Sequence, residues 1–330
     1  MKSLKNKEIL SHSYQSSFRL KRSKKLIKLE FLNLMKILEL NLKKKDLLLI
    51  KKKFNKYKLY YSNPTISELD NFFYFFINFL KSNFITKSGK QKYISWENGW
   101  KQNYKNFKLY KKKKYLKPAF VRNSSLIRIK GKYIKPVTNN FESKLFDIVR
   151  NATFLKFFKN VDNIYEFGCG TGHNLIGLQE IFPQKKYIGL DYAKFSQKIL
   201  GLINSKYKNI TGVNFDIIKP SNFKLYLNSG VFTCGALEQV GSKYINFFEY
   251  LRSNSPNVVI NFETMHELYN NDNISDYLSK EYLVKRNYLK NYLSFLRKKE
   301  KEGIIKILHC KRVFGNQFHE GYSFVCFNFV

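Results

Sequence analysis

The stretch that most constrains the fold is a glycine-rich turn after a short apolar segment. Residues 164–167 are apolar apart from Glu166, and glycines stand at every second position from Gly168 to Gly172. A strand that ends in such a turn is typically followed by a helix, which we expect over 174–182. Glycine permits positive φ and lets another group approach the backbone closely. The pattern therefore predicts a strand–turn–helix unit whose turn holds a ligand.

Three further apolar strands follow, and each leads into an acidic residue. The strands are expected at 186–190, 211–215 and 230–235, before Asp191, Asp216 and Glu238 respectively. Steps of 23, 25 and 22 residues separate Gly168, Asp191, Asp216 and Glu238, as expected for successive β–α units. In open α/β sheets, ligands bind outside the carboxyl ends of the strands. The four signals therefore predict one shared ligand site.

The glycine spacing separates two nucleotide-binding classes. The dinucleotide fingerprint G-x-G-x-x-G would need a glycine where His173 stands. The acidic-x-G-x-G-x-G pattern that begins at Glu166 instead resembles motif I of the class I S-adenosylmethionine-dependent methyltransferases. The catalytic half is also loosely similar to uncharacterised bacterial methyltransferases of small-molecule or surface-glycan type. The resemblance implies a methyltransferase whose cofactor is S-adenosylmethionine (SAM).

The resemblance also implies which residues contact the cofactor. In this family the glycine turn wraps the amino-acid end of SAM, the acid after the second strand binds the ribose, and the acid after the third reads the adenine amino group. His173 is expected to help hold the cofactor carboxylate. The implied cofactor-binding residues are Glu166, Gly168, Cys169, Gly170, Gly172, His173, Asn174, Asp191, Tyr192, Asp216, Ile217, Ala236, Leu237 and Glu238.

The expected fold class is α/β, a Rossmann-like mixed seven-stranded sheet with helices on both faces. Further strands are predicted at 257–262, 303–312 and 322–330, with helices at 246–253 and over a long stretch from 273 to 302. The resemblance implies that the last strand is antiparallel and lies between strands five and six. Residues 141–330 are expected to form this domain.

Candidate catalytic groups lie near strand ends. Methyl transfer needs an acceptor atom held about 3 Å from the methyl carbon and often a base. Glu263, His266 and His319 are the candidates we favour, and a structural hydrogen bond is the alternative for each histidine. Glu238, Glu267, Glu320 and Tyr322 are further candidates, while Arg286 and Tyr288 either reach an anionic substrate or lie on the surface.

Cysteine spacing gives no sign of a metal site. The four cysteines, at 169, 234, 310 and 326, form no C-x-x-C pair. We expect no metal, and reduced, mostly buried thiols. No apolar leader is seen at the N-terminus, so a cytoplasmic protein is expected.

Residues 1–140 are expected to form a mainly helical accessory region rich in lysine and aromatic residues. Helical spacing runs over 26–50, and an apolar run at 72–80 predicts a buried helix far shorter than the roughly 20 residues of a membrane span. Alternation over 126–134 predicts a hairpin. Both tryptophans lie in 96–104, which either packs on the catalytic domain or forms a substrate lid.

Positive charge is concentrated in this accessory region. The first 160 residues carry +30 of the formal net charge of +36, and Lys111–Lys114 form a run. Such a face favours polyanions such as nucleic acid or anionic lipid surfaces. The alternative is a solvated, lysine-rich surface produced by genome composition.

The methyl acceptor is not specified by the sequence. The N-P-P-[YFW] or D-P-P-[YFW] motif of many base amino-methylases is absent, because 235–238 read Gly-Ala-Leu-Glu. We therefore favour methyl transfer to an oxygen or nitrogen of a small molecule or glycan, with an anionic acceptor left open. The alternative is an RNA- or ribosome-directed methyltransferase that uses the basic N-terminal region.

Overall fold

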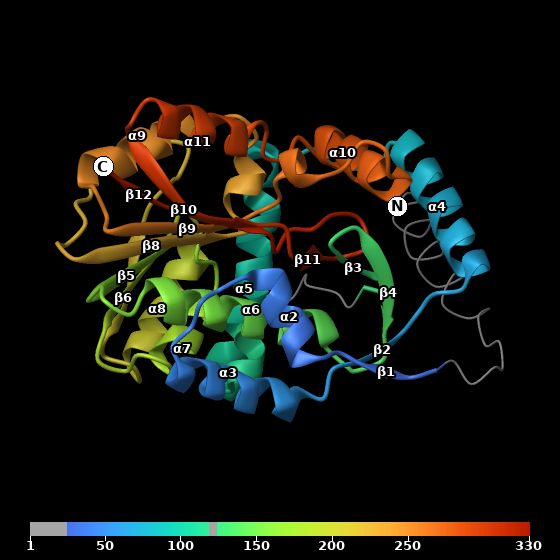
Figure 1. Cartoon of the computed structure of the whole chain (residues 1–330). Helices are drawn as coiled ribbons and strands as arrows, with labels where there is room; N and C mark the ends of the chain where they lie inside the picture. Colours follow the sequence, from blue (N-terminus) through green and yellow to red (C-terminus); the bar gives the residue numbers. More distant parts are fainter. Residues whose placement is uncertain (1–24, 119–123) are drawn as a thin grey trace.

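The protein is built on a central seven-stranded sheet (Figure 1). The computed structural model describes residues 25–118 and 124–330. The strand order is β10-β12-β9-β8-β5-β6-β7. The strands are β5 (Asn163–Phe167), β6 (Lys186–Asp191), β7 (Ile210–Asn214), β8 (Ser229–Cys234), β9 (Val258–Phe262), β10 (Ile305–Lys311) and β12 (Phe324–Phe329).

The direction of the last strand confirms the expected topology. β5 to β9 pair in parallel, whereas β12 runs antiparallel to both β9 and β10 and lies between them. Every residue of β5 and of β9 is buried, as expected for strands covered on both faces. This arrangement brings the carboxyl ends of β5, β6 and β8 together at one edge.

Helices cover both faces of this sheet, as predicted. Ile164 of β5 packs in a core shared with α6, α7 and α8, whereas its neighbour Tyr165 packs with α9 and α11 on the other face. The helices of this half are α6 (Phe141–Phe157), α7 (His173–Gln179), α8 (Lys194–Asn204), α9 (Ile245–Asn254), α10 (Ile274–Arg286) and α11 (Tyr292–Lys301).

The prediction of one long helical stretch after the fifth strand is wrong. The stretch expected from 273 to 302 consists of two helices, α10 and α11. Asn287 and Asn291, between them, have φ values of 54° and 53°. Asparagine tolerates this left-handed region better than most residues, so the helix ends there and the chain turns.

The N-terminal region combines helices with a second, small sheet. Its elements are β1 (Ile27–Lys28), α2 (Phe31–Leu38), α3 (Lys44–Tyr57), β2 (Tyr60–Ser62), α4 (Ile66–Lys81), α5 (Tyr93–Tyr110), β3 (Ile127–Ile129) and β4 (Lys132–Pro136). The predicted hairpin is confirmed as β3 and β4. The predicted helical stretch 26–50 contains β1 and two helices that are separated at Glu39, whose φ is 49°. Single helical turns lie at η1 (Lys90–Lys92), η2 (Lys113–Leu116), η3 (Leu237–Val240) and η4 (His266–Leu268).

The small sheet joins the two halves of the chain. Its order is β1-β2-β4-β3-β11, and β11 (Phe314–Gly315) comes from the C-terminal half. A buried ion network reinforces this junction, because Arg128 on β3 pairs with Asp276, which Arg312 also contacts at 2.6 Å. Residues on the two sides of the predicted boundary at residue 140 are thus in contact. The division of the chain into two domains stays a prediction.

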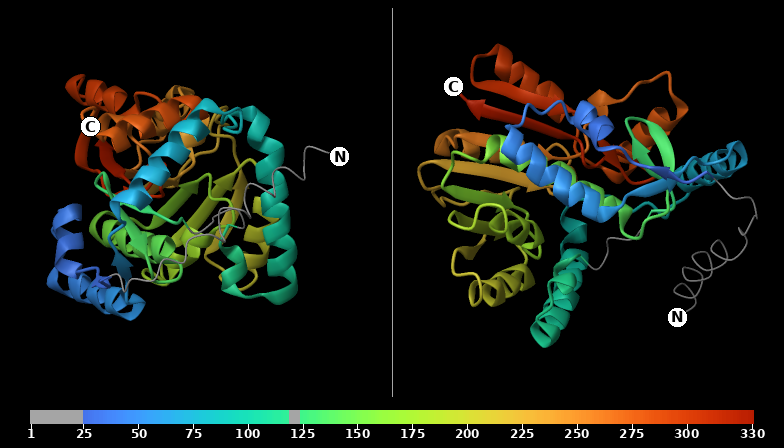
Figure 2. Two further views of the ribbon diagram at one scale, coloured as in Figure 1. Left: turned by 90° about the vertical axis from the view of Figure 1, so that its right-hand side faces the viewer. Right: turned by 60° about the horizontal axis from the view of Figure 1, so that its bottom comes forward.

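Helix α4 is buried on one face only. Phe72 and Phe76 lie inside an aromatic cluster with Tyr282 and Phe318, but Tyr74 is 72% exposed. Figure 2 (left) shows α4 in cyan and α5 in teal, with strands of the central sheet visible between them. Among residues 25–118 and 124–330, no helix is long and apolar enough to span a membrane.

Candidate active site

A cavity of about 1200 Å³ lies at the carboxyl ends of the central strands. Its walls come from the turns after β5, β6 and β8, from α4, α5 and α6, and from the loop 316–322. All but two of the fourteen residues implied for the cofactor line it, and the two exceptions are Gly172 and Leu237. This is the edge at which the strand-end pattern predicted a ligand site.

The glycine turn is held in a shape that only glycine adopts easily. Gly168, Gly170 and Gly172 have φ values of 71°, 53° and 69°. A Cβ on Gly168 would overlap the side chain of Ala236, and one on Gly170 would lie 2.7 Å from the ring of Trp100. The turn therefore leaves no space for side chains, and its backbone forms part of the cavity wall.

Two polar atoms beside this turn are buried without a hydrogen-bond partner among the described residues. Glu166 is 1% exposed, and its Oε1 accepts a 2.5 Å hydrogen bond from Asn174 while Oε2 has no partner. Burial raises the pKa of this carboxyl to about 8. The Nδ1 atom of His173 also lacks a partner, and burial lowers the pKa of this imidazole to about 3. Buried polar groups in native proteins usually have a hydrogen-bond partner, so these two atoms are available to a polar group that enters the cavity.

Asp191 holds the glycine turn as well as lining the cavity. Its Oδ2 accepts a 2.8 Å hydrogen bond from the backbone N–H of Gly170, and its Oδ1 accepts one of 2.9 Å from Ala193. Burial raises its pKa to about 6, although these two hydrogen bonds oppose the rise. Each oxygen retains a further lone pair that can accept a hydroxyl.

Helix α5 forms the wall of the cavity next to Asp216. The ring of Tyr93 stacks on that of Tyr192, with centroids 4.1 Å apart, and its hydroxyl lies 3.3 Å from both carboxylate oxygens of Asp216. Trp96 and Trp100 line the cavity one and two turns further along. The sequence pointed to the tryptophan segment but not to Tyr93, since no local pattern links residue 93 to residue 216.

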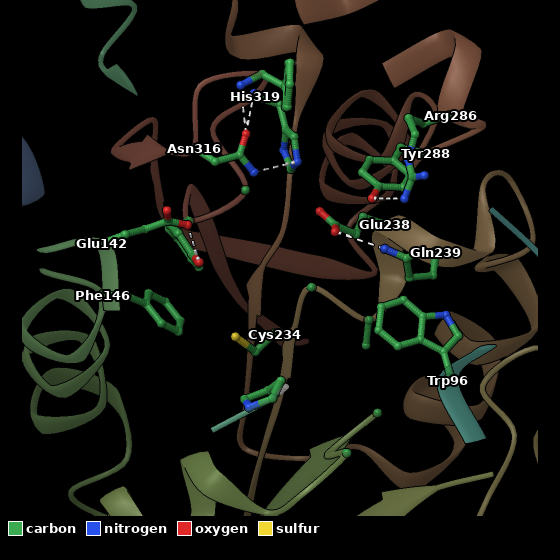
Figure 3. Close-up of a pocket in the computed structure, with 18 of the residues that line it drawn as sticks. Trp96, Glu142, Phe146, Cys234, Glu238, Gln239, Arg286, Tyr288, Asn316 and His319 are labelled. Carbon is green, nitrogen blue, oxygen red and sulfur yellow. Dashed lines mark hydrogen bonds between the residues drawn. The ribbon is translucent and has the colours of Figure 1, made fainter. Parts of the chain in front are cut away.

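The far end of the cavity is formed by carboxyl, imidazole and aromatic groups. Figure 3 shows Glu142 and Glu238 on opposite sides, with His319 above them and Cys234 below in this view. Among the described residues, the Glu238 side chain accepts one hydrogen bond, 3.1 Å from Gln239. Burial raises the pKa of Glu238, and the nearby Glu263 carboxylate raises it further.

Asn316 fixes the tautomer of His319, that is, which ring nitrogen carries the proton. The Oδ1 atom of Asn316 accepts hydrogen bonds from the backbone N–H groups of Phe318 (2.8 Å) and His319 (3.2 Å), so its Nδ2 faces the Nε2 of His319 at 3.3 Å. Burial lowers the pKa of His319 to about 3, which keeps the ring neutral. Nε2 therefore accepts, and Nδ1 carries a proton that has no acceptor among the described residues.

Arg286 and Tyr288, left open by the sequence, both line this end of the cavity. The guanidinium donates a 2.7 Å hydrogen bond to the Tyr288 hydroxyl and one of 2.8 Å to the carbonyl of Thr86. Tyr322 also lines the cavity and donates to Glu142 at 2.9 Å. Glu320 does not line it, because its carboxylate binds Arg312 and the backbone N–H of Gly131.

Two favoured catalytic candidates lie outside the cavity. The Glu263 carboxylate accepts hydrogen bonds from the backbone N–H groups of residues 236, 237 and 238 at 2.9–3.1 Å, and so fixes the start of η3. His266 lies 3.4 Å from Glu267 on η4 and does not line the cavity. Of the three candidates, only His319 faces the cavity.

The part of the chain that the structure describes contains no group of three or more His, Cys, Asp or Glu residues that could hold a metal ion. All four cysteines are free thiols, of which Cys169 and Cys326 are buried. Burial raises the pKa of the Cys169 thiol well above its usual value, so it stays protonated at neutral pH.

Comparison with protein-family models finds no match, and neither does comparison with curated proteins. Solved structures match part of the chain. The CurJ carbon methyltransferase has 14% identity over 58% of this chain and 55% of its own, with a TM-score of 0.41. Human N-acetylserotonin methyltransferase in complex with SAM has 10% identity over 56% and 55%, with a TM-score of 0.38. The chain spans little more than half the length of these structures.

The class of fold follows from the strand order itself. Parallel strands β7, β6, β5, β8 and β9, followed by antiparallel β12 between β9 and β10, form the sheet that the resemblance implied. The chain therefore has the class I SAM-dependent methyltransferase fold.

Proposed function

We propose that the protein is a SAM-dependent methyltransferase that acts on an oxygen or nitrogen of a small molecule or glycan. The observation that carries this proposal is the convergence of three features in one cavity. They are the glycine turn, the Glu166 carboxyl, whose Oε2 has no partner among the described residues, and the carboxylates Asp191 and Asp216 near strand ends. NAD binding would use a different glycine spacing.

The residues present fit SAM. The unpaired Oε2 of Glu166 can accept from the cofactor ammonium group, and the glycine turn admits the amino-acid backbone. Asp191 would bind the ribose hydroxyls, and Asp216 the adenine amino group. Bound SAM would supply a methyl group activated by the sulfonium: the acceptor oxygen or nitrogen would bond to the methyl carbon as the carbon–sulfur bond breaks, and S-adenosylhomocysteine would leave.

The chain's own groups at the far end would prepare the acceptor. Glu238 can receive the acceptor proton, because burial raises its pKa towards the pH at which a base works best. The Nδ1–H of His319 can donate a hydrogen bond that orients the acceptor. In this scheme Glu263 positions Glu238 through its backbone N–H, 2.9 Å away, without contacting the acceptor.

Two buried carboxyl groups, Glu142 and Glu238, line the acceptor end together with the Arg286 guanidinium. Within the described residues, neither Glu142 nor Glu238 forms an ion pair with a lysine or arginine at 4 Å or less. Burial raises the pKa of both, although Lys117 opposes the rise at Glu142 and Arg286 opposes it at Glu238. A neutral hydroxyl or an amine can donate a hydrogen bond to these carboxyl groups.

An RNA- or ribosome-directed methyltransferase is the second candidate. The observation in its favour is the +30 charge of the first 160 residues. RNA that co-purifies with the protein and is released by salt would support it. The small-molecule proposal predicts no RNA retained at physiological salt.

Calorimetric titration with SAM and with its demethylated product, S-adenosylhomocysteine, tests the cofactor assignment. We expect micromolar binding to the wild type, weaker binding to Glu166→Gln, and none of NAD. Tighter binding of NAD than of SAM would overturn the assignment. For the acceptor, panels of hydroxylated and amine compounds should show turnover with the wild type and at least a hundredfold less with Glu238→Gln, the usual order for loss of a general base.

A further inference from the structure

The contact between Tyr93 and the strand ends has the features expected of a bound base. A flat ring stacks on Tyr192 with an interplanar angle of 20°, and a polar hydrogen at its rim points to the Asp216 carboxylate. Adenine bound at the same residues would present a flat ring to Tyr192 and its amino group to Asp216. The side chain and the base therefore require the same two partners.

The space beside the Tyr192 ring cannot hold both the Tyr93 ring and a bound base. Two stacked rings with a third between them need centroids about 7 Å apart, twice the van der Waals spacing of about 3.5 Å. The centroids of Tyr93 and Tyr192 are 4.1 Å apart. A base that stacks on Tyr192 must displace Tyr93.

Tyr93 lies at the start of a helix, shortly after a glycine, and a displacement there needs the fewest changes in the rest of α5. Tyr93 is the first residue of α5, and it follows η1 and Gly89, which has a φ of 128°. Before this glycine the chain is fixed, because the Ser88 hydroxyl donates to Gln239 at 2.9 Å. The Ser88 backbone N–H also bonds the carbonyl of Arg286 at 2.7 Å. The Gln91 side chain in η1 donates to the Ser88 carbonyl at 3.0 Å, so a movement of Tyr93 has its pivot after η1 or breaks this hydrogen bond.

We propose that Tyr93 occupies the adenine position of the cofactor site and that binding of the cofactor displaces it together with the first turn of α5. The inference rests on the proposed function. The first turn of α5 then competes with the cofactor for the adenine position. The affinity for SAM therefore reflects the free energy of the Tyr93 contacts that are lost as well as the free energy of the contacts that SAM makes in the pocket.

Three variants test the competition by titration with S-adenosylhomocysteine and with adenosine. Tyr93→Ala removes the ring and the hydroxyl, and we expect both probes to bind about three- to tenfold more tightly. Tyr93→Phe keeps the stack but loses the hydroxyl, so its affinity for the two probes should lie between those of the wild type and of Tyr93→Ala. Tyr110→Ala is the matched control, because Tyr110 lies at the other end of α5 and stacks on Tyr115, outside the cavity.

Weaker binding by Tyr93→Ala would show that Tyr93 is a wall of the pocket, and unchanged binding would show that it does not contact the base position. Either result overturns the inference and leaves the proposed function standing. If neither probe binds to the wild type or to Tyr93→Ala, the proposed function is wrong and the inference fails with it.

Tryptophan fluorescence gives an independent readout of α5. The chain has two tryptophans, and both Trp96 and Trp100 lie on this helix. S-adenosylhomocysteine should shift the emission of the wild type, and free Tyr93→Ala should already show part of that shift. Emission that is the same in both free proteins and does not respond to saturating ligand would contradict displacement of α5.

Discussion

The carboxylate of Asp191 accepts a 2.8 Å hydrogen bond from the backbone N–H of Gly170. One residue therefore has two tasks, to hold the glycine turn in its positive-φ shape and to present oxygen atoms to the cavity. If Asp191 binds the ribose as proposed, the position of that ribose and the shape of the turn would be coupled through a single side chain.

Asp191→Ala should weaken binding of S-adenosylhomocysteine by roughly 1.5–3 kcal/mol, the range for hydrogen bonds to a charged group. It should also lower the free energy of unfolding, because the N–H groups of Gly170 and Ala193 lose their acceptor. Asp191 is buried, so these N–H groups have little access to water as a replacement acceptor. Titration and urea denaturation measure the two effects, and an unchanged dissociation constant in a folded variant would show that Asp191 does not contact the cofactor.

Gly170→Ala should lower the free energy of unfolding by about 2–4 kcal/mol, from left-handed strain and overpacking together. The added methyl would lie 2.7 Å from the Trp100 ring, so α5 must shift and the tryptophan emission should change. Gly201→Ala on α8 is the control, since a Cβ there meets nothing within 4 Å and alanine favours a helix. Equal stability of the two variants would contradict this account of the turn.

The ligand-free protein should lose about 1–2 kcal/mol of stability between pH 7 and 8.5. Burial raises the pKa of Glu166 to about 8 and also raises that of Glu238, so the folded state holds protons that the unfolded chain has already released. Stability is therefore lost as the pH rises through the folded-state pKa. His173 and His319, each with a pKa lowered to about 3, are mostly neutral in both states over this range.

Urea midpoints at pH 7 and pH 8.5 check this trend. Glu166→Gln should flatten it, and Glu281→Gln on the exposed side of α10 should leave it unchanged. A midpoint that rises with pH in the wild type would contradict the burial of uncompensated carboxyl groups.

The lysine run Lys111–Lys114 should affect polyanion binding but not cofactor binding. All four side chains are exposed and lie outside the cavity. Replacing them with glutamine should leave the S-adenosylhomocysteine affinity within twofold of the wild type, at low and at physiological salt. If single-stranded RNA binds the wild type, its salt slope should fall by up to about 3. An unaltered slope would mean that these lysines form a solvated surface only.

The gathering of the proposed cofactor-binding residues around one cavity could be predicted because its signals are local. Glu166, Asp191 and Asp216 each lie within two residues of the carboxyl end of a strand, and parallel strands bring such positions to one edge whatever the details of packing. The order of the strands followed from the resemblance. Neither step needed knowledge of which side chains meet across the cavity.

The acceptor half depends on contacts between distant segments. No local pattern shows that Asn316 fixes the ring of His319 towards the cavity, or that Glu263 turns away to bind the backbone of η3. The break between α10 and α11 rests on two asparagines that were compatible with helix in the pattern of apolar residues. In each case tertiary packing decides between alternatives that the local sequence leaves open.

The pairing of β3 with β11 has a consequence for how the protein folds. Ile129 meets Phe314 in this ladder, and the loop that carries His319 begins directly after it. A contact between segments so far apart in the chain closes late in folding, because the entropy of loop closure opposes it until other structure has formed. The cavity is therefore among the last parts to be completed. A nascent chain can build most of its central sheet before any acceptor site exists, and the appearance of activity would mark the end of folding.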